Sequence, residues 1–298
     1  MRLYAGMSDD FIRDTIRNHI AERLREAFFA YYRYQPSRGE VNSWRNSLRA
    51  MKDVLDIASL HDHGILLKYQ LPLSSRRIDC MVCGRDGQRV DNAVIVELKQ
   101  WERCEPAEAD KLVNSWVGGS RRDVLHPSVQ VGQYRQYLED THVAFHEELK
   151  PVQLSACSYL HNYLSDSTDP LLAPKFAEVL RNNPLFDSDG AESLATYLRA
   201  HLADGNGRPV LKRIEDSPFR PRRKLMDHVA TVIGSRSPWI LLDEQLVVEP
   251  KGRVPRILLE PIESLVGESL DLWREVPIRG PELRRSVMSQ RGVVLPAA

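Results

Sequence analysis

The chain has 298 residues, 42% of them hydrophobic, so it can bury a sizeable core as one large domain or two smaller ones. Basic and acidic residues number 41 each, and this zero net charge excludes binding to nucleic acid through a global basic field. No apolar run reaches the roughly 18 residues of a membrane span, and the N-terminus does not read as a signal peptide. We therefore expect a cytoplasmic protein without membrane association.

The N-terminal region is predicted to be helical. Over residues 8–33, apolar side chains recur every three or four positions, which is typical of an amphipathic helix. The aromatic and basic stretch 31–34 could stack on bases, but the amphipathic pattern favours a helix end that covers a core. A turn-forming segment follows at residues 35–39. We expect residues 1–36 to form an N-terminal helical segment.

A second helix is predicted from about residue 40, with an apolar stripe that would face a sheet. The stripe consists of Trp44, Leu48, Met51, Leu55 and Ala58. Ser37 and Glu40 have the spacing of a capping box, and a carboxylate near a helix start suits the helix dipole. A second, compatible interpretation places Glu40 next to a bound metal.

Three strands are predicted next, over residues 65–71, 76–83 and 93–101. The last two form a hairpin, because turn-forming residues fill the segment between them. Side chains alternate along a strand, so Glu97 and Lys99 share a face, and Asp79 on the neighbouring strand can meet them. Such charged groups are costly to bury in apolar strands and are tolerated mainly at functional sites. The hairpin is therefore the candidate active site.

Four cysteines stand at positions 80, 83, 104 and 157, too few and too irregular for a disulfide framework. Cys80 and Cys83 have a spacing found in metal sites. On an extended strand, however, residues three positions apart point to opposite faces, and no second pair of this kind occurs. We expect reduced thiols that bind no metal.

The segment after residue 101 is predicted to be a charged loop. A glycine pair precedes Arg121 and Arg122, which suits a mobile loop near phosphates and equally a solvated surface. A helix is then predicted with Ser128 as its N-cap, and a further strand covers residues 152–159. The single histidines at positions 63, 126 and 161 are assigned no catalytic role, because a lone histidine is most often a structural hydrogen-bonding group.

The helix after Ser128 carries Gln130 and Tyr134 on one face. The order of Asp79, Glu97-x-Lys99 and Gln130-x-x-x-Tyr134 resembles the PD-(D/E)xK nuclease superfamily, in particular its RecB-like branch. The sequence departs from the pattern at Ile78, where a proline is expected. Glu-x-Lys alone is a weak pattern, since it recurs at residues 148–150 and 249–251, so the order of the motifs carries the resemblance.

The resemblance implies an α/β fold with a restriction-endonuclease-like α-β-β-β-α-β core and a mixed sheet over residues 37–165. A narrower resemblance, over roughly residues 35–250, is to the N-terminal nuclease-like region of bacterial Schlafen-type DNA/RNA helicases. It rests on Glu40 with Ser43-Trp44, Arg77-Ile78-Asp79, residues 97–101, His126-Pro127-Ser128, residues 130–134 and residues 159–162. No phosphate-binding Gly-x-x-x-x-Gly-Lys-Ser/Thr occurs, so we expect no ATP hydrolysis and a helicase or ATPase supplied in trans.

The resemblance implies a Mg2+- or Mn2+-dependent deoxyribonuclease, with RNA as the alternative substrate and phage defence or DNA repair as the setting. Its catalytic residues would be Asp79, Glu97 and Lys99, and Lys99 would orient or deprotonate the attacking water. The metal would be held by Asp79, Glu97, the backbone carbonyl of Leu98 and Glu40. Gln130 and Tyr134 would support the site. Contacts with phosphates would come from Arg76, Arg77, Arg121 and Arg122.

A non-catalytic nucleic-acid-binding or assembly module is the alternative function. The missing motor motivates it, whereas the retained set of Asp79, Glu97 and Lys99 favours catalysis. Beyond the nuclease-like region, residues 166–280 are predicted to form a mainly helical accessory region, and residues 281–298 a loose tail.

Overall fold

A computed structural model describes residues 2–72, 74, 76–146 and 149–221 of the chain. These residues belong to one compact unit, which extends across the predicted boundaries near residues 36 and 165. The predicted tail and the part of the accessory region beyond residue 221 lie outside the described residues.

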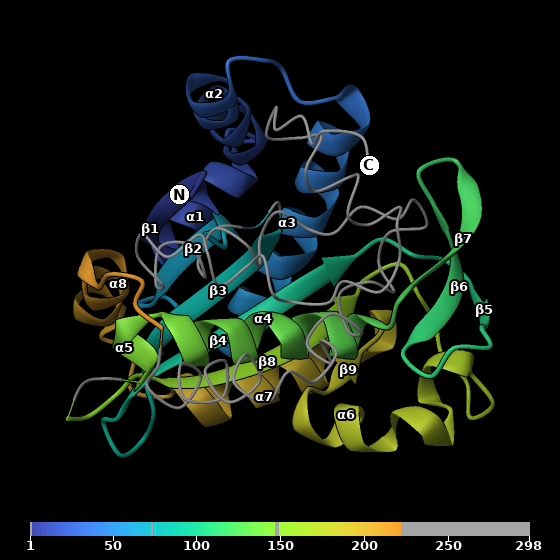
Figure 1. Ribbon diagram of the computed structural model, residues 1–298. Helices are drawn as coiled ribbons and strands as arrows, with labels where there is room; N and C mark the ends of the chain where they lie inside the picture. The colour runs from blue at the N-terminus through green and yellow to red at the C-terminus, as the bar shows by residue number, and fades with distance from the viewer. Residues whose placement is uncertain (1, 73, 75, 147–148, 222–298) are drawn as a thin grey trace, which may run out of the picture. The chain divides into compact units, whose positions relative to one another are not determined.

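The unit is built on a mixed sheet of six strands in the order β1-β2-β3-β4-β8-β9 (Figure 1). The strands are Tyr4–Met7 (β1), Gly64–Gln70 (β2), Arg77–Arg85 (β3), Asp91–Lys99 (β4), Gln153–Leu160 (β8) and Leu185–Phe186 (β9). Strands β1 to β4 pair antiparallel, whereas β8 joins β4, and β9 joins β8, in parallel. The predicted α/β class and mixed sheet are confirmed. The four central strands correspond to the predicted ones, and β1 and β9 were not predicted.

Helices cover both faces of this sheet (Figure 1). One face carries α1 (Ser8–Ile16), α2 (Ile20–Tyr32), α3 (Arg38–Ala58) and α7 (Ala191–Leu202). The other carries α4 (Pro127–Thr141), α5 (Val143–His146) and α8 (Gly207–Asp216). We call the two sets of buried residues the α3-side cluster and the α4-side cluster.

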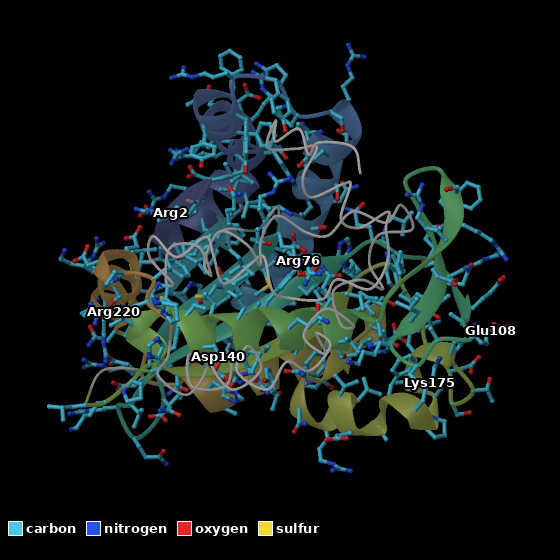
Figure 2. The ribbon with its side chains drawn as sticks, viewed as in Figure 1. Arg2, Arg76, Glu108, Asp140, Lys175 and Arg220 are labelled. Atoms are coloured by element: carbon cyan, nitrogen blue, oxygen red, sulfur yellow. The ribbon has the colours of Figure 1, made fainter. Side chains whose placement is uncertain are left out.

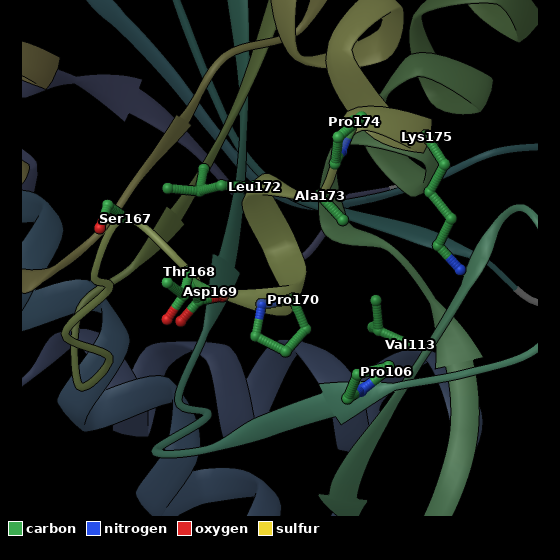
Figure 3. A pocket seen from close by; sticks show the side chains of 10 residues that line it. All are labelled: Pro106, Val113, Ser167, Thr168, Asp169, Pro170, Leu172, Ala173, Pro174 and Lys175. Atoms are coloured by element: carbon green, nitrogen blue, oxygen red, sulfur yellow. The ribbon is translucent and has the colours of Figure 1, made fainter.

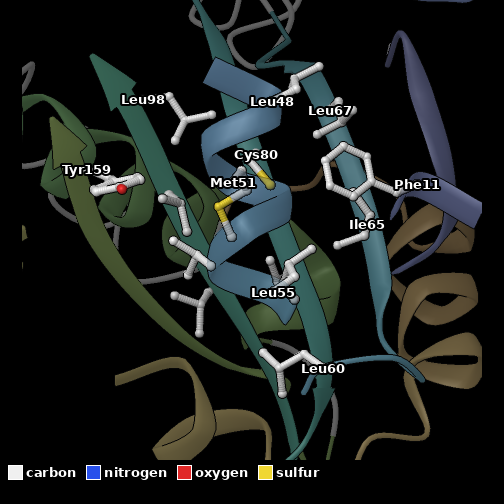
Figure 4. Packing of buried hydrophobic residues seen from close by; sticks show 14 of the residues in the cluster. Phe11, Leu48, Met51, Leu55, Leu60, Ile65, Leu67, Cys80, Leu98 and Tyr159 are labelled. Carbon is white, nitrogen blue, oxygen red and sulfur yellow. The ribbon is translucent and has the colours of Figure 1, made fainter. Parts of the chain in front are cut away.

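The α3-side cluster confirms the apolar stripe predicted for the second helix. Leu48, Met51 and Leu55 of α3 are almost completely buried and pack on the sheet beside Ile65 and Cys80 (Figure 4). Neighbouring strand residues alternate between the two clusters, as the period of two requires. Burying apolar side chains on both faces is the main stabilising contribution to this architecture.

Two predicted elements differ from the structure. The single helix expected over residues 8–33 is two helices, because the chain turns at Asn18, whose φ is 58°. The charged loop expected after residue 101 is a second sheet of β5 (Cys104–Pro106), β6 (Leu112–Val117) and β7 (Ser120–Leu125). Gly118 and Gly119 form its tight turn with φ of 62° and 83°, a conformation that favours glycine.

Of the two predicted helix caps, one is confirmed and one is wrong. The Ser37 hydroxyl accepts a hydrogen bond from the amide of Glu40 at 3.1 Å and caps α3. Helix α4 begins two residues earlier than expected, because His126 and not Ser128 is its N-cap. The His126 ring accepts from the amide of Ser128, and Pro127 occupies the first helical position, where its missing N–H costs nothing.

The segment after β8 is mainly helical up to residue 221. Besides β9, α7 and α8 it contains short helices at Pro170–Leu172 (η1), Pro174–Phe176 (η2), Ala177–Asn182 (α6) and Ser188–Gly190 (η3). No helix within the described ranges has the length and apolar character to cross a membrane.

Candidate active site

Asp79 on β3 and Lys68 on β2 lie opposite each other, at a point where both strands change the face they present. Leu67 and Cys80 pair with each other and pack in the α3-side cluster. The next pair that the two strands form, Tyr69 with Ile78, packs in the α4-side cluster on the opposite face. Lys68 accommodates this change with a φ of 51°, a left-handed conformation that costs a non-glycine residue about 1–2 kcal/mol.

Both oxygens of the Asp79 carboxylate have donors. Oδ1 accepts from Nζ of Lys68, and Oδ2 accepts from the backbone amide of Leu98 at 3.0 Å. Burial would raise the pKa of Asp79, but the ammonium groups of Lys68 and Lys99 outweigh it and lower the pKa below its usual value. Asp79 is therefore an ionised carboxylate that is firmly oriented toward β4.

Glu97 on β4 is almost completely buried, with 2% of its surface exposed. Its Oε1 accepts from Nζ of Lys99 at 2.8 Å and from Nε2 of Gln130 at 2.7 Å. Its Oε2 is buried and has no hydrogen-bond partner among the residues that the structure describes. Burial, followed by repulsion from Asp79, raises the pKa of Glu97 to about 7. One carboxylate oxygen is thus left available in a desolvated position.

Gln130 on α4 joins the two functional side chains of β4. Its Oε1 accepts from Lys99 at 2.9 Å, while its Nε2 donates to Glu97 and also to the Tyr134 hydroxyl at 2.7 Å. Burial would lower the pKa of Lys99, but the carboxylates of Glu97 and Asp79 raise it, so Lys99 is an ammonium group. The structure thus brings together Asp79, Glu97, Lys99, Gln130 and Tyr134, all of which the sequence indicated.

Glu40 has a different environment. Its carboxylate pairs with Arg77 at 2.9 Å, and the Arg77 guanidinium also lies 5.4 Å from the centre of the Phe28 ring. No three His, Cys, Asp or Glu side chains converge as metal ligands anywhere in the described part of the chain. The structure therefore does not bring Glu40 into one cluster with Asp79 and Glu97.

The four arginines expected at phosphates fall into two places. Arg76, which Figure 2 labels, immediately precedes β3 and donates to Gln133 of α4 at 2.8 Å, and Arg77 is the first residue of β3. Arg121 and Arg122 lie on β7 of the second sheet. Arg121 pairs with Glu105, and Arg122 donates to Ser120. Only the first pair is next to Asp79 in the chain.

Two site residues were missed by sequence reasoning. Lys68 is a charged residue in an otherwise apolar strand, as Asp79 is, and this pattern was sufficient to predict it as a site residue. Ser158 on β8 pairs in register with Glu97, is fully buried, and its hydroxyl has no partner among the described residues. A serine in a strand carries no such signal, because it is common on strands of many kinds.

A separate hollow of about 260 Å³ lies between the second sheet and the η1–η2 segment (Figure 3). Its charged groups already have structural partners. Lys175 donates to the carbonyls of Ala107 and Ala109, and Asp169 accepts from the Tyr163 hydroxyl and the Leu171 amide. The remaining lining is largely apolar, so this hollow offers no group for acid-base chemistry.

The chemistry of the site suits a hard divalent cation. Asp79 and Glu97 provide carboxylate oxygens, the ligands that Mg2+ and Mn2+ prefer, and Oε2 of Glu97 is buried without a partner within residues 2–221 as far as the structure describes them. Cys80 and Cys83 do not share a face of the sheet, because Cys80 packs in the α3-side cluster and Cys83 in the α4-side cluster.

Comparisons with models of protein families, with curated proteins and with solved structures give no match.

Proposed function

We propose that this chain is a metal-dependent nuclease that hydrolyses phosphodiester bonds in DNA. The observation that supports it best is one buried group of side chains, formed by Asp79, Glu97 and Lys99 on neighbouring strands and Gln130 on α4. Such a set is costly to bury, and Oε2 of Glu97 finds no hydrogen-bond partner among the described residues. We also propose that the mixed sheet and the helices packed on it form a restriction-endonuclease-like core.

Asp79, Glu97 and the backbone carbonyl of Leu98 would hold the metal. A divalent cation in such a site lowers the pKa of a bound water and offsets the charge of the phosphate. Asp79 suits this role because its carboxylate is ionised and oriented by the Leu98 amide. Glu97 suits it because Oε1 is fixed by two donors, while Oε2 has no partner in the described part of the chain.

Lys99 would act on the water and on the phosphate. Its ammonium group lies in the same group of side chains as both carboxylates and is oriented by Glu97 and Gln130. A positive charge at this position stabilises the negative charge that develops on the phosphate oxygens as water attacks. Gln130 and Tyr134 would act as positioning residues, since they contact Glu97 and Lys99.

Substitution of Asp79 tests the proposal. Wild-type protein should bind Mn2+ in a calorimetric titration and cleave DNA, whereas Asp79→Asn, which preserves the shape of the side chain, should lose both. Asp140→Asn is the matched control, because Asp140 lies about 15 Å along α4 from Gln130 and contacts Gln136. Single- and double-stranded DNA and RNA should all be offered. Mn2+ binding and cleavage by Asp79→Asn at wild-type levels would overturn the assignment.

A non-catalytic nucleic-acid-binding module remains the second candidate, and one observation favours it. Both carboxylates already pair with lysines of the same chain, Asp79 with Lys68 and Glu97 with Lys99. A site that is neutral by itself can persist without a bound cation. This candidate predicts a wild-type protein that binds DNA with equal affinity in EDTA and in Mn2+ and cleaves no substrate.

A further inference from the structure

Lys68 is placed unusually for a strand lysine. Its side chain is 17% exposed, and its ammonium group contacts Oδ1 of Asp79. It is not a turn residue, because both of its neighbours on β2 pair with residues of β3. The backbone nevertheless adopts a φ of 51° here, where glycine or asparagine would fit with less strain. A strained backbone conformation persists where the surrounding structure imposes it, and here the pairing of β2 with β3 on both sides of Lys68 does so.

The contact of Lys68 balances the charge of the site. When both carboxylates are ionised, Asp79 and Glu97 contribute two negative charges, and Lys68 and Lys99 contribute two positive charges. Lys99 and Gln130 contact only Oε1 of Glu97, so they leave Oε2 open. Both oxygens of Asp79, in contrast, have donors, and one of those donors is the Lys68 ammonium. A divalent cation that binds to Asp79 therefore meets a like charge at contact distance.

We propose that Lys68 is an internal counter-ion of Asp79, which a divalent cation displaces when it binds. The proposal rests on the proposed function in so far as Asp79 is taken as a metal ligand. Lys68 is thus a positioning residue that weakens metal affinity and holds the Asp79 carboxylate in place when no metal is bound. Once displaced, its ammonium group is next to the site and can contact a phosphate of the substrate.

The test compares Mn2+ binding by calorimetry in wild-type protein and in Lys68→Met, which preserves side-chain length and removes the charge. Removing a like charge at contact distance should tighten Mn2+ binding about tenfold or more. The matched control is Lys52→Met, because Lys52 pairs with Asp56 on α3 at 2.8 Å and has no contact with the site. Its Mn2+ affinity should equal that of the wild type.

Lys68→Gly provides a second variant, since glycine adopts the same positive φ without strain and should fold if methionine does not. It too should bind Mn2+ more tightly than the wild type, and Mn2+ should raise its melting temperature further. A purely structural role would lower the stability of both variants and leave their Mn2+ affinity unchanged.

The outcomes separate this inference from the proposed function. Equal or weaker Mn2+ binding by the folded Lys68 variants, with Asp79-dependent binding in the wild type, overturns the inference alone. If Mn2+ binds to the Lys68 variants and not to the wild type, the result supports the inference that Lys68 competes with the cation for Asp79. If Mn2+ binds to none of the proteins, the metal site itself is absent, and both the proposed function and the inference are wrong.

Discussion

Lys99 donates to Oε1 of Glu97 at 2.8 Å from the same face of β4, two residues further along the strand. Lys99 makes no hydrogen bond to Asp79 in the structure, since Asp79 is oriented by Lys68 and by the amide of Leu98. Glu97 would also retain its bond from Gln130 if Lys99 were removed. Both carboxylates should therefore keep their positions without Lys99.

Lys99→Ala should separate metal binding from chemistry. We expect Mn2+ affinity equal to the wild type or slightly higher, because a nearby positive charge is removed. Cleavage of DNA should fall by about 10²- to 10³-fold, the usual contribution of an electrostatic stabiliser, because Lys99 is an ammonium group in the folded protein. Calorimetry and a single-turnover assay measure the two quantities, and Asp79→Ala should lose both. Cleavage by Lys99→Ala at the wild-type rate would show that Lys99 has no catalytic role.

The pKa of Glu97 predicts a pH dependence of stability in metal-free protein. Folded Glu97 retains its proton up to about pH 7, whereas the unfolded chain releases it near 4.5. The folded state therefore binds more protons between these values, and stability falls as the pH rises from about 4.5 to 7. Glu97→Gln should remove this slope, which is worth at most about 3 kcal/mol. Urea unfolding at pH 5 and 7.5 checks it, and parallel profiles for both proteins would contradict it.

The hairpin of β3 and β4 and the helices α3 and α4 could be predicted because the sequence patterns that indicate them are local. The stripe of α3 repeats at helical spacing, and Asp79, Glu97 and Lys99 are charged residues in apolar strands. The order of motifs then placed Gln130 beside them, and the structure has it there. Each of these inferences needed only the sequence within one or two neighbouring elements.

The features that were missed depend on pairing between distant segments. Strand β1 is only four residues long and pairs with β2 some sixty positions later, so it has no local pattern of its own. The left-handed conformation of Lys68 follows from the change of face that β2 shares with β3. Two of the three strands of the second sheet, β5 and β7, are short and carry charged residues, a composition that a solvated loop also has.

Gly207 allows the N-terminus of α8 to approach the start of β2. A Cβ at this position would lie 2.1 Å from the backbone nitrogen of Gly64, and that backbone cannot move aside without disturbing β2. We expect Gly207→Ala to destabilise the protein by about 3 kcal/mol, the upper end of the usual cost of overpacking. Gly87→Ala is the control, since a Cβ there would meet nothing within 4 Å. Equal urea midpoints for the two variants would contradict the close approach.

Glu40 should prove to be a structural residue, with its carboxylate paired to Arg77 and its amide capped by Ser37. Because it does not converge with Asp79 and Glu97, Glu40→Gln should leave Mn2+ affinity unchanged in a calorimetric titration. The substitution should lower the free energy of unfolding by at most about 1 kcal/mol, the usual range for a partly exposed ion pair. In a protein that already carries Arg77→Met, Glu40→Gln should cause no further loss, because the ion pair is then already absent. A loss of Mn2+ affinity of about tenfold or more is the effect expected of a group that supports a metal. That result would show that Glu40 belongs to the metal site and that its pairing with Arg77 is exchanged when the cation binds.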